Sequence, residues 1–368
     1  MHNHVKWRNL DIPTIILTLV ICAGGVLMVW SATRAFPLQD PILYVRQQLM
    51  WIGMGLVALA AVVSINYKSF FQWGWIVYAA SALLLLAVLY LGREAGGATR
   101  WLDLGFINLQ PSEWAKIALI IILARLLAQR SNRLNKVCSL VPMFCCLLVA
   151  LFLISIQPDL GTSLVLVFIF VAMLFMAAVP VKFLAGISAA GAALVPLLYA
   201  GLFEYQRMRL VAFLNLEADP LGSGYQVKQA LIAIGSGGIE GKGFFQGTQA
   251  QLQFIPEQHT DFIFSVLGEE LGLIGALLLL LAYLLLIYRI LHIGSVAADF
   301  FGALLCVGVA AMIAFQVIVN IGINVGLIPV TGLPLPLVSY GGNAMLVNLV
   351  SVGIVLNVGL RREKALFT

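Results

Sequence analysis

The chain has 368 residues, of which 62% are hydrophobic and only 10% are charged, and its mean hydropathy is +1.02. Because soluble domains have roughly 45–50% apolar residues, this composition excludes a soluble globular protein and indicates a polytopic membrane protein. The formal net charge of +5 is then a signal of membrane topology, and it gives no reason to expect a nucleic-acid partner. The five cysteines lie in or beside apolar runs without metal-site spacing, so they do not indicate a redox compartment.

Ten apolar runs predict helices that cross a hydrocarbon core, which takes roughly 20 residues. Their ranges are 12–33, 47–66, 70–91, 113–129, 138–156, 162–178, 182–202, 262–289, 300–325 and 344–360. If both termini are cytoplasmic, twelve Lys and Arg lie in inner segments against four in the short outer loops, which is the expected bias. The first run is too long for a signal-peptide core and should remain as the first helix. The predicted fold is an all-α integral membrane protein, a bundle of ten transmembrane helices in a single domain, 1–368.

Charged residues beside the fourth helix are the first candidates for function. "GATRWLDLG" (97–105) places Arg100 and Trp101 together, an amphipathic pair typical of an outer interface belt. "PSEWAK" places Glu113 and Lys116 three residues apart on one helix face. A charge at the bilayer centre costs on the order of 2.5–3.5 kcal/mol. Either Lys116 is a cation held at the outer mouth of a cavity, or it snorkels to water and pairs with Glu113 for topology alone.

Another carboxylate follows in "QPDLGT" (157–162), in the turn between the fifth and sixth helices. Asp159 stands just before the sixth helix, where a carboxylate is favoured by the free N–H groups and by the helix dipole. Capping of that helix is therefore favoured over a direct part in catalysis.

A long outer segment, 203–261, separates the seventh and eighth helices, and we expect it to form short helices at the membrane surface. Within it, "IGSGGIEGKGFFQGTQ" (234–249) surrounds Lys242 with glycines, which let backbone N–H groups approach a phosphate closely. It lacks the nucleotide P-loop pattern. With Arg207 and Arg209, Lys242 makes this segment basic enough to hold an anionic lipid headgroup.

The segment ends in "PEQHTDFIFSVLGEELG" (256–272), which gathers the titratable residues Glu257, His259, Asp261, Glu269 and Glu270. Asp261 lies at the water boundary, next to low dielectric, which suits a general base of tuned pKa. Alternatively, Asp261 and Thr260 only cap the eighth helix. Glu269 and Glu270 lie about 12–14 Å deeper at 1.5 Å per residue. We expect this deep pair to bond to backbone or cations and to hold the helix in place.

The connection between the ninth and tenth helices, "GLIPVTGLPLPLVSYGG" (326–342), is uncharged and rich in Pro and Gly. Irregular backbone at membrane depth is tolerated only when it is buried in protein or lines a cavity. The loop therefore either dips inward and walls a cleft or is a plain surface loop of weakly polar residues.

Several of these motifs together resemble one family. "GATRWLDLG", "QPSEWAK", "QPDLGTS", "YQRMRL", "DPLGSGYQ", "AIGSGGIEGKGFFQGTQ", "PEQHTDFIFSVLGEELG" and "LPLVSYGG" occur in the order found in the SEDS family of bacterial shape, elongation, division and sporulation membrane proteins. The resemblance covers essentially the whole chain. Its short termini and outer segment are more similar to the elongation branch than to the division branch.

The resemblance implies a peptidoglycan glycosyltransferase that polymerises lipid II on the outer face of the bacterial inner membrane. It also implies a class B penicillin-binding protein and other elongation-complex proteins as partners. The family's essential aspartate corresponds to Asp261, and other motif positions correspond to Trp101, Glu113, Lys116 and Asp159. The family commonly reads SYGGS, whereas this chain reads "SYGGN" from Ser339 to Asn343, so any role specific to serine at the last position is in doubt.

In the mechanism that this resemblance suggests, Asp261 is the general base. Lys116, ahead of Arg209 and Lys242, stabilises the departing lipid pyrophosphate. No cofactor is predicted, and participation of Mg²⁺ or Mn²⁺ is left open because the sequence has no closed metal cage. The rival function is a lipid II flippase with Glu113, Lys116 and the deep acids as a polar path. The chain shows no repeat symmetry of the kind common in transporters, and a pure scaffold would not explain the carboxylates, so the enzyme is favoured.

Overall fold

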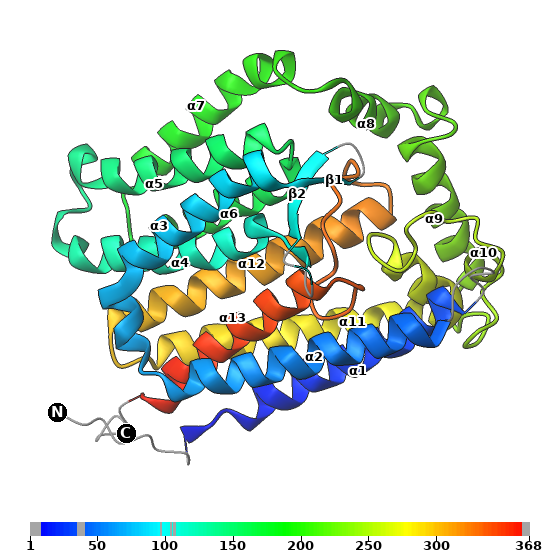
Figure 1. Ribbon diagram of the computed structural model, residues 1–368, viewed down its shortest axis with the longest axis horizontal. Coiled ribbons are helices and arrows are strands. Elements are labelled where there is room, and N and C mark those ends of the chain that lie inside the picture. Colours follow the sequence, from blue (N-terminus) through cyan, green and yellow to red (C-terminus); the bar gives the residue numbers. More distant parts are fainter. Residues whose placement is uncertain (1–8, 35–40, 96–97, 104, 106–107, 363–368) are drawn as a thin grey trace.

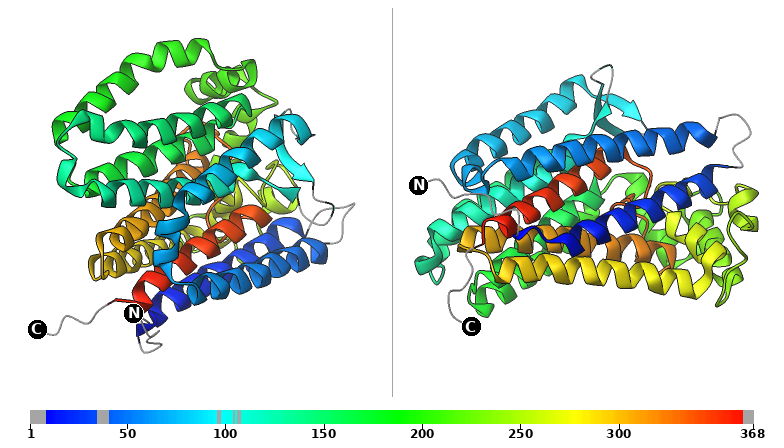
Figure 2. Two further views of the ribbon diagram at one scale, coloured as in Figure 1. Left: turned by 60° about the vertical axis from the view of Figure 1, so that its left-hand side comes forward. Right: turned by 90° about the horizontal axis from the view of Figure 1, so that it is seen from below.

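A computed structural model describes residues 9–34, 41–95, 98–103, 105 and 108–362. Lys6, Arg8 and Lys364, on which the predicted orientation partly depends, lie outside these residues. All ten predicted spans are helices: α1 (Ile12–Thr33), α2 (Pro41–Ser64), α3 (Tyr67–Leu91), α4 (Pro111–Gln129), α5 (Val137–Ile156), α6 (Leu160–Met176), α7 (Val181–Ala200), α11 (Ile263–Ser295), α12 (Phe300–Asn324) and α13 (Gly342–Leu360). The start of α1 and the end of α13 lie at the same end of the bundle (Figures 1 and 2).

Seven of the described helices are long and apolar enough to cross a membrane: α1, α2, α3, α5, α11, α12 and α13. The chain is thus a multi-pass membrane protein. α6 is shorter, and α4 carries Glu113, Lys116 and Arg125 in its 19 residues. That α4, α6 and α7 also cross the membrane stays a prediction.

The two C-terminal helices form the centre of the bundle. Within their most apolar windows, 94% of α13 and 78% of α12 are buried inside the protein, against 22% for α2 and α3. Such all-round burial explains why α12 and α13 are apolar on every side. α7 lies at the edge of the molecule (Figure 1). The core is therefore built around α12 and α13, and the C-terminal end of α12 carries part of the site described below.

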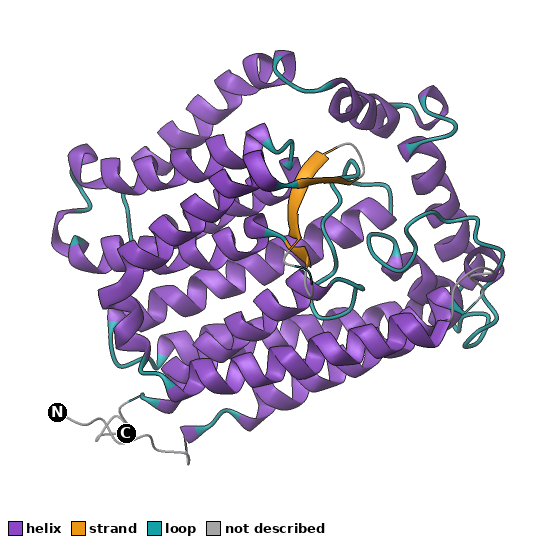
Figure 3. Cartoon of the chain, in the orientation of Figure 1, coloured by secondary structure: helices purple, strands orange, loops and turns teal. Residues whose placement is uncertain are grey.

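Small elements gather at the other end of the molecule. The outer segment forms α8 (Glu204–Leu214), α9 (Ser223–Gly237) and α10 (Thr248–Gln251), as the sequence predicts, with a 3-10 turn at Leu216–Ala218; another lies at Ser131–Arg133. Three short strands were not predicted: β1 (Arg93–Ala95), β2 (Ala98–Asp103) and β3 (Asn108–Leu109). They form an antiparallel sheet in the order β1-β2-β3, drawn in orange in Figure 3. This pairing satisfies backbone groups in the connection between α3 and α4.

α11 departs from the prediction because it runs six residues further, to Ser295, and breaks at Gly272. Gly272 has φ 62° and ψ −160°, a conformation that glycine adopts without steric cost. The Gly-rich segment closes the break: Leu273 N–H donates to the Gly238 carbonyl at 2.9 Å, and Lys242 N–H donates to the Glu269 carbonyl at 3.0 Å. In this structure the glycine-rich segment therefore pairs with the backbone groups that the break in α11 leaves without partners in the helix.

The loop between α12 and α13, residues 325–341, turns into the protein. Leu333, Leu335 and Leu337 are buried in its interior. The Tyr283 hydroxyl of α11 donates to the Pro336 carbonyl at 2.5 Å, and the Gln48 side chain of α2 donates to the Ser339 carbonyl at 3.2 Å. Of the two alternatives from the sequence, the inward loop is confirmed and the surface loop is wrong.

Candidate active site

The turn that carries Asp261 is held by its backbone. Two amides inside the turn, those of Thr260 and Phe262, donate to the Glu257 carbonyl at 3.2 and 3.3 Å. The 325–341 loop holds the next two carbonyls, because the Tyr340 amide donates to His259 at 2.9 Å and the Ser339 hydroxyl donates to Thr260 at 2.6 Å. Ser339 thus supports the turn through a direct contact.

The Asp261 carbonyl is held from α12. The side-chain amides of Asn320 and Asn324 both donate to it, each at 3.0 Å. Each amide donates a second bond, Asn320 to the Leu333 carbonyl at 2.9 Å and Asn324 to the Asn320 carbonyl at 2.8 Å. The position of Asp261 is therefore fixed by α12 and the buried 325–341 loop, which meet around the backbone of this turn.

The Asp261 carboxylate, by contrast, has no hydrogen-bond partner among the residues that the structure describes. α11 has Phe262 as its N-cap and no capping side chain from that residue, so the alternative in which Asp261 merely caps the helix is not what the structure shows. Asp261 as a residue is partly exposed. Burial and, to a lesser extent, the nearby Glu257 charge raise the pKa of Asp261 to about 6, against the opposing effect of Arg209. A base with this pKa is ionised, yet still basic, near neutral pH.

His259 lies beside the rings of Tyr44 and Tyr340, with centroid distances of 5.3 and 5.5 Å. Burial lowers the pKa of His259, and the Glu257 charge opposes that shift. The imidazole is therefore neutral at neutral pH and adds no positive charge next to Asp261. Its packing beside these two rings supports the turn.

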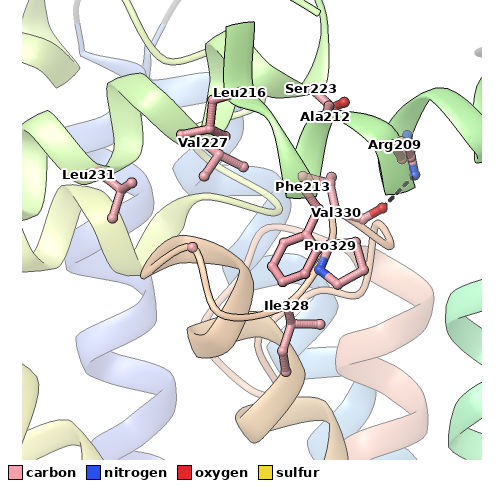
Figure 4. Close-up of a pocket in the computed structure, with 11 residues that line it drawn as sticks. Arg209, Ala212, Phe213, Leu216, Ser223, Val227, Leu231, Ile328, Pro329 and Val330 are labelled. Carbon is pink, nitrogen blue, oxygen red and sulfur yellow. Dashed lines mark hydrogen bonds between the residues drawn. The ribbon is translucent and has the colours of Figure 1, made fainter. Parts of the chain in front are cut away.

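Arg209 on α8 stands between two pockets. One, of about 350 Å³ of empty space, lies between α8, α9 and residues 326–330 (Figure 4). The other, of about 540 Å³ of empty space, is lined by Arg100, Tyr205 and the apolar side chains of Leu160 and Leu164. Arg209, Pro329 and Val330 line both. The guanidinium donates to the Val330 carbonyl at 3.3 Å. The same cation therefore borders both pockets and lowers the pKa of Asp261.

Arg100 joins β2 to the turn before α6. It donates to the Gln157 carbonyl at 3.0 Å and to the Tyr205 hydroxyl at 3.1 Å, and it also bonds the Pro158 carbonyl. Its neighbour Trp101 is partly buried and lies opposite Arg93 in the sheet. Arg100 thus lines the larger pocket, and its guanidinium is already hydrogen-bonded to the protein.

Asp159 caps α6, as the sequence favoured. Its carboxylate accepts from the Thr162 amide at 3.1 Å and from the Thr162 hydroxyl at 2.8 Å. The Ser112 hydroxyl of α4 adds a contact at 3.3 Å. This carboxylate therefore positions the turn that Arg100 contacts.

Glu113 and Lys116 form the expected pair on α4. The ammonium lies 2.8 Å from both carboxylate oxygens, and Lys116 has no exposed surface. Because Lys116 does not reach water, the snorkelling alternative is wrong. Removing one partner of such a buried ion pair strongly destabilises the fold, because the other charge is left buried and unpaired. In this structure the pair is enclosed, and a part in substrate binding stays a prediction.

The deep acids lie at the break in α11 and hold it, as expected. Glu269 accepts from the Lys242 ammonium at 2.7 Å, the Gln249 amide at 2.9 Å, the Ala250 amide at 3.1 Å and the Thr248 hydroxyl at 3.2 Å. Glu270 accepts from the Ser31 hydroxyl of α1 at 2.5 Å. Lys242 is thus paired with Glu269, and its predicted contact with a substrate stays untested.

Two further predicted residues have local partners. Arg207 is exposed, bonds the Ala200 carbonyl and lies 5.8 Å from the Tyr199 ring centre, so it faces α7. Asn343, at the start of α13, is buried and donates to the Asn108 carbonyl of β3 at 2.5 Å. A side-chain amide at this position therefore ties the small sheet to α13.

Comparison with known proteins places this site in a family. The model of the cell cycle protein family that groups FtsW, RodA and SpoVE matches residues 12–364. The chain belongs to the FtsW/RodA/SpoVE family. It is 40% identical to the peptidoglycan glycosyltransferase MrdB of Escherichia coli K12, over 96% of this chain and 95% of that protein.

Solved structures agree with this FtsW/RodA/SpoVE assignment. A chain from a structure of a peptidoglycan synthase complex has a TM-score of 0.83 and 32% identity, covering 96% of this chain and 98% of that one. The rod shape determining protein RodA of Thermus thermophilus has a TM-score of 0.73 and 31% identity, covering 97% and 99%. Sequence and structure therefore both show the multi-pass helical fold. Together with the relatives, they show that the chain is a protein of the inner membrane.

Two residues of this site, Asn320 and Asn324, were not predicted from the sequence. A signal was present, since Gln316, Asn320 and Asn324 recur every four residues along an otherwise apolar helix, and that spacing places them on one face. All three are fully buried. Polar side chains inside a membrane helix mark functional or pairing positions.

Proposed function

We propose that this chain is a peptidoglycan glycosyltransferase that polymerises lipid II into glycan strands during cell elongation. The observation that carries the proposal is that Asp261 is a partly exposed residue whose carboxylate is unbonded to other described residues while its backbone is fixed. Curated relatives named as peptidoglycan glycosyltransferases support it. So does the pKa of about 6 for Asp261, which suits a base working near neutral pH.

In the proposed reaction, Asp261 takes the proton from the sugar 4-hydroxyl of the acceptor. The resulting oxygen attacks the anomeric carbon of the donor, and the bond from that carbon to the phosphate oxygen breaks. An α-phosphate linkage is thereby inverted to a β-1,4 glycoside, and the lipid pyrophosphate leaves with the electron pair. The fixed backbone of the turn holds the base in place, so little ordering is required when the substrates bind.

Charge on the leaving pyrophosphate needs a cation that can reach it. Lys116 was expected to come first, but it is enclosed with Glu113, and Lys242 is paired with Glu269. Arg209 lines both pockets, and its guanidinium makes a single bond, to a neutral carbonyl, among the hydrogen bonds of the described residues. We therefore propose Arg209 as the main phosphate-binding residue, with Arg100 of the larger pocket beside it.

Among the described residues, no three His, Cys, Asp or Glu side chains gather in a group that could hold a metal ion. We derive no step through Mg²⁺ or Mn²⁺. Whether the reaction needs a divalent ion bound by the substrate pyrophosphates is tested by comparing polymerisation with and without EDTA.

The proposal extends to orientation and partners. With both termini cytoplasmic, the turn of Asp261 faces the outer side, where the predicted outer segment lies. One structural relative comes from a complex that coordinates polymerization and crosslinking. A class B penicillin-binding protein in the same membrane, and other elongation-complex proteins, are the partners we propose on that likeness.

The deciding experiment compares wild type with Asp261→Asn on purified lipid II in detergent, with and without a class B partner. Because positioned general bases contribute roughly 10²- to 10⁴-fold, we expect the near-isosteric variant to lose at least about a hundredfold in polymerisation rate. Glu257→Gln, which removes an exposed charge from the same turn, is the matched control and should stay active at neutral pH.

Equal polymerisation by wild type and Asp261→Asn would exclude Asp261 as the base. If wild type makes no strands even with the partner, lipid II transfer across liposome membranes becomes the measurement that decides for the flippase.

A further inference from the structure

The first turn of α11 is capped by a side chain from another helix. With Phe262 as N-cap, Ser265 is the third helical residue, and its amide is one that a capping side chain normally satisfies. Here the Ser265 amide donates to both the Phe262 carbonyl and the Asn324 side-chain oxygen, each at 3.0 Å, and the Ser265 hydroxyl donates to the same Asn324 oxygen at 2.5 Å. Asn324 is fully buried and 59 residues away along the chain.

The same side chain also holds the backbone of Asp261. While its oxygen caps α11, its nitrogen donates to the Asp261 carbonyl at 3.0 Å, where Asn320 donates as well. In an α-helix extended by one residue, that carbonyl would accept from the Ser265 amide. The two asparagines therefore occupy both groups whose pairing would add Asp261 to the helix.

An uncapped α11 would attract the Asp261 carboxylate. Aspartate is among the best capping residues, and a negative charge is stabilised at a helix N-terminus. A carboxylate bound to amides is held in its charged form, so it becomes a weaker base. Asp261 nevertheless makes no such bond in the described part of the chain, where Asn324 holds the Ser265 amide and both asparagines hold the Asp261 carbonyl, so that Asp261 stays one residue outside the helix.

We propose that Asn324, assisted by Asn320, is a positioning residue that caps α11 in place of Asp261 and so keeps the Asp261 carboxylate free for the acceptor hydroxyl. This inference rests on the proposed function, in which Asp261 is the base. It assigns to α12 a part in catalysis that is exerted entirely through the backbone and first turn of a neighbouring helix.

The test is the pH dependence of lipid II polymerisation in Asn324→Ala. Without Asn324, the Ser265 amide and the Asp261 carbonyl can pair and extend α11 by one residue. Asp261 then becomes the N-cap, its carboxylate binds first-turn amides and loses basicity, and kcat should fall by about tenfold or more. The acidic limb of the pH–rate profile, which reports ionisation of the base, should move to lower pH, while KM changes little. A loss of packing alone would lower the rate without moving that limb.

Two further variants keep the test decisive if Asn324→Ala does not fold. Asn324→Ser keeps a polar group but is too short to bridge both partners, so it should shift the limb in the same direction. Asn320→Ala leaves the cap in place and removes one of the two bonds to the Asp261 carbonyl, so its shift should be smaller. Asn348→Ala is the matched control, because Asn348 is an equally buried asparagine, on α13, with no hydrogen bond to 259–265 among those of the described residues.

Hydrogen–deuterium exchange gives a readout that does not depend on activity. The first turn of α11 should stay protected in Asn324→Ala, because Asp261 replaces the lost cap, and should lose protection in the double variant with Asp261→Ala. If wild type is active, Asp261→Asn is inactive, and the acidic limb is unmoved in both Asn324 variants, this inference is wrong while the proposed function stands. If Asp261→Asn is active, the proposed function itself fails.

Discussion

Asp261 and Glu269 lie eight residues apart in one short stretch, yet the structure treats their carboxylates in opposite ways. At Asp261 the backbone carbonyl takes two side-chain amides while the carboxylate is left without a hydrogen bond in the described structure. At Glu269 the carboxylate itself accepts four bonds, from Lys242, Thr248 and two backbone amides. A carboxylate that satisfies so many partners is structural, whereas one that is held only through its backbone is free to react.

The largest effect that would sharpen this comparison is on stability, at Glu269. Breaking a fully buried ion pair by removing one partner costs about 3–5 kcal/mol. Glu269 is fully buried but the Lys242 side chain is partly exposed, so the cost here should lie below that range. We expect Glu269→Gln to lower the unfolding temperature in detergent by an amount that reflects this loss. Asp261→Asn, the control, should unfold near the wild-type temperature while losing polymerisation. If the two variants unfold at the same temperature, the contrast between the two carboxylates is wrong.

A smaller effect is expected at Gly332, which faces the free carboxylate. Gly332 has φ 75°, so alanine there costs about 1–3 kcal/mol in backbone strain. The added Cβ would also lie 3.7 Å from an Asp261 carboxylate oxygen, within the space that a substrate hydroxyl needs. Gly332→Ala should therefore lose activity beyond its loss of stability.

Gly238→Ala provides the matched control for Gly332, because Gly238 also has a positive φ, 57°, but its Cβ would meet nothing within 4 Å. Polymerisation rates per folded protein should fall for Gly332→Ala and stay close to wild type for Gly238→Ala. Equal losses in the two variants would assign the effect to backbone strain.

The smallest effect is a shift in pH dependence without loss of fold. Because Asp261 must be ionised to accept a proton, the rate should rise with pH through about 6 and then level off. Arg209 lowers the pKa of Asp261 and Glu257 raises it. Arg209→Gln should therefore move the acidic limb to higher pH, and Glu257→Gln should move it to lower pH. Shifts in the same direction, measured from pH–rate profiles, would contradict the assignment of the limb to Asp261.

Contacts within one turn of a helix could be predicted from the sequence alone. Glu113 and Lys116 meet because residues three apart share a helix face, and Asp159 caps α6 because the residue before a helix faces its free amides. The ten apolar helices follow equally from hydrophobic length. The orientation in the membrane is still a prediction from the charge bias, and the strand-forming segment 93–109 had no pattern that distinguished it from a loop.

The tertiary structure alone decided which acid is free. Whether a carboxylate is bonded depends on groups that packing brings to it: Lys242 reaches Glu269 from 27 residues away, and Asn324 reaches the Asp261 carbonyl from 63 residues away. Local spacing carries no information about such contacts, because they depend on how α9, α11 and α12 pack and on the break at Gly272. The sequence by itself determined the helices and placed the reactive candidate at a helix start. The packing of the helices decided that the cap comes from α12, which leaves the Asp261 carboxylate unbonded.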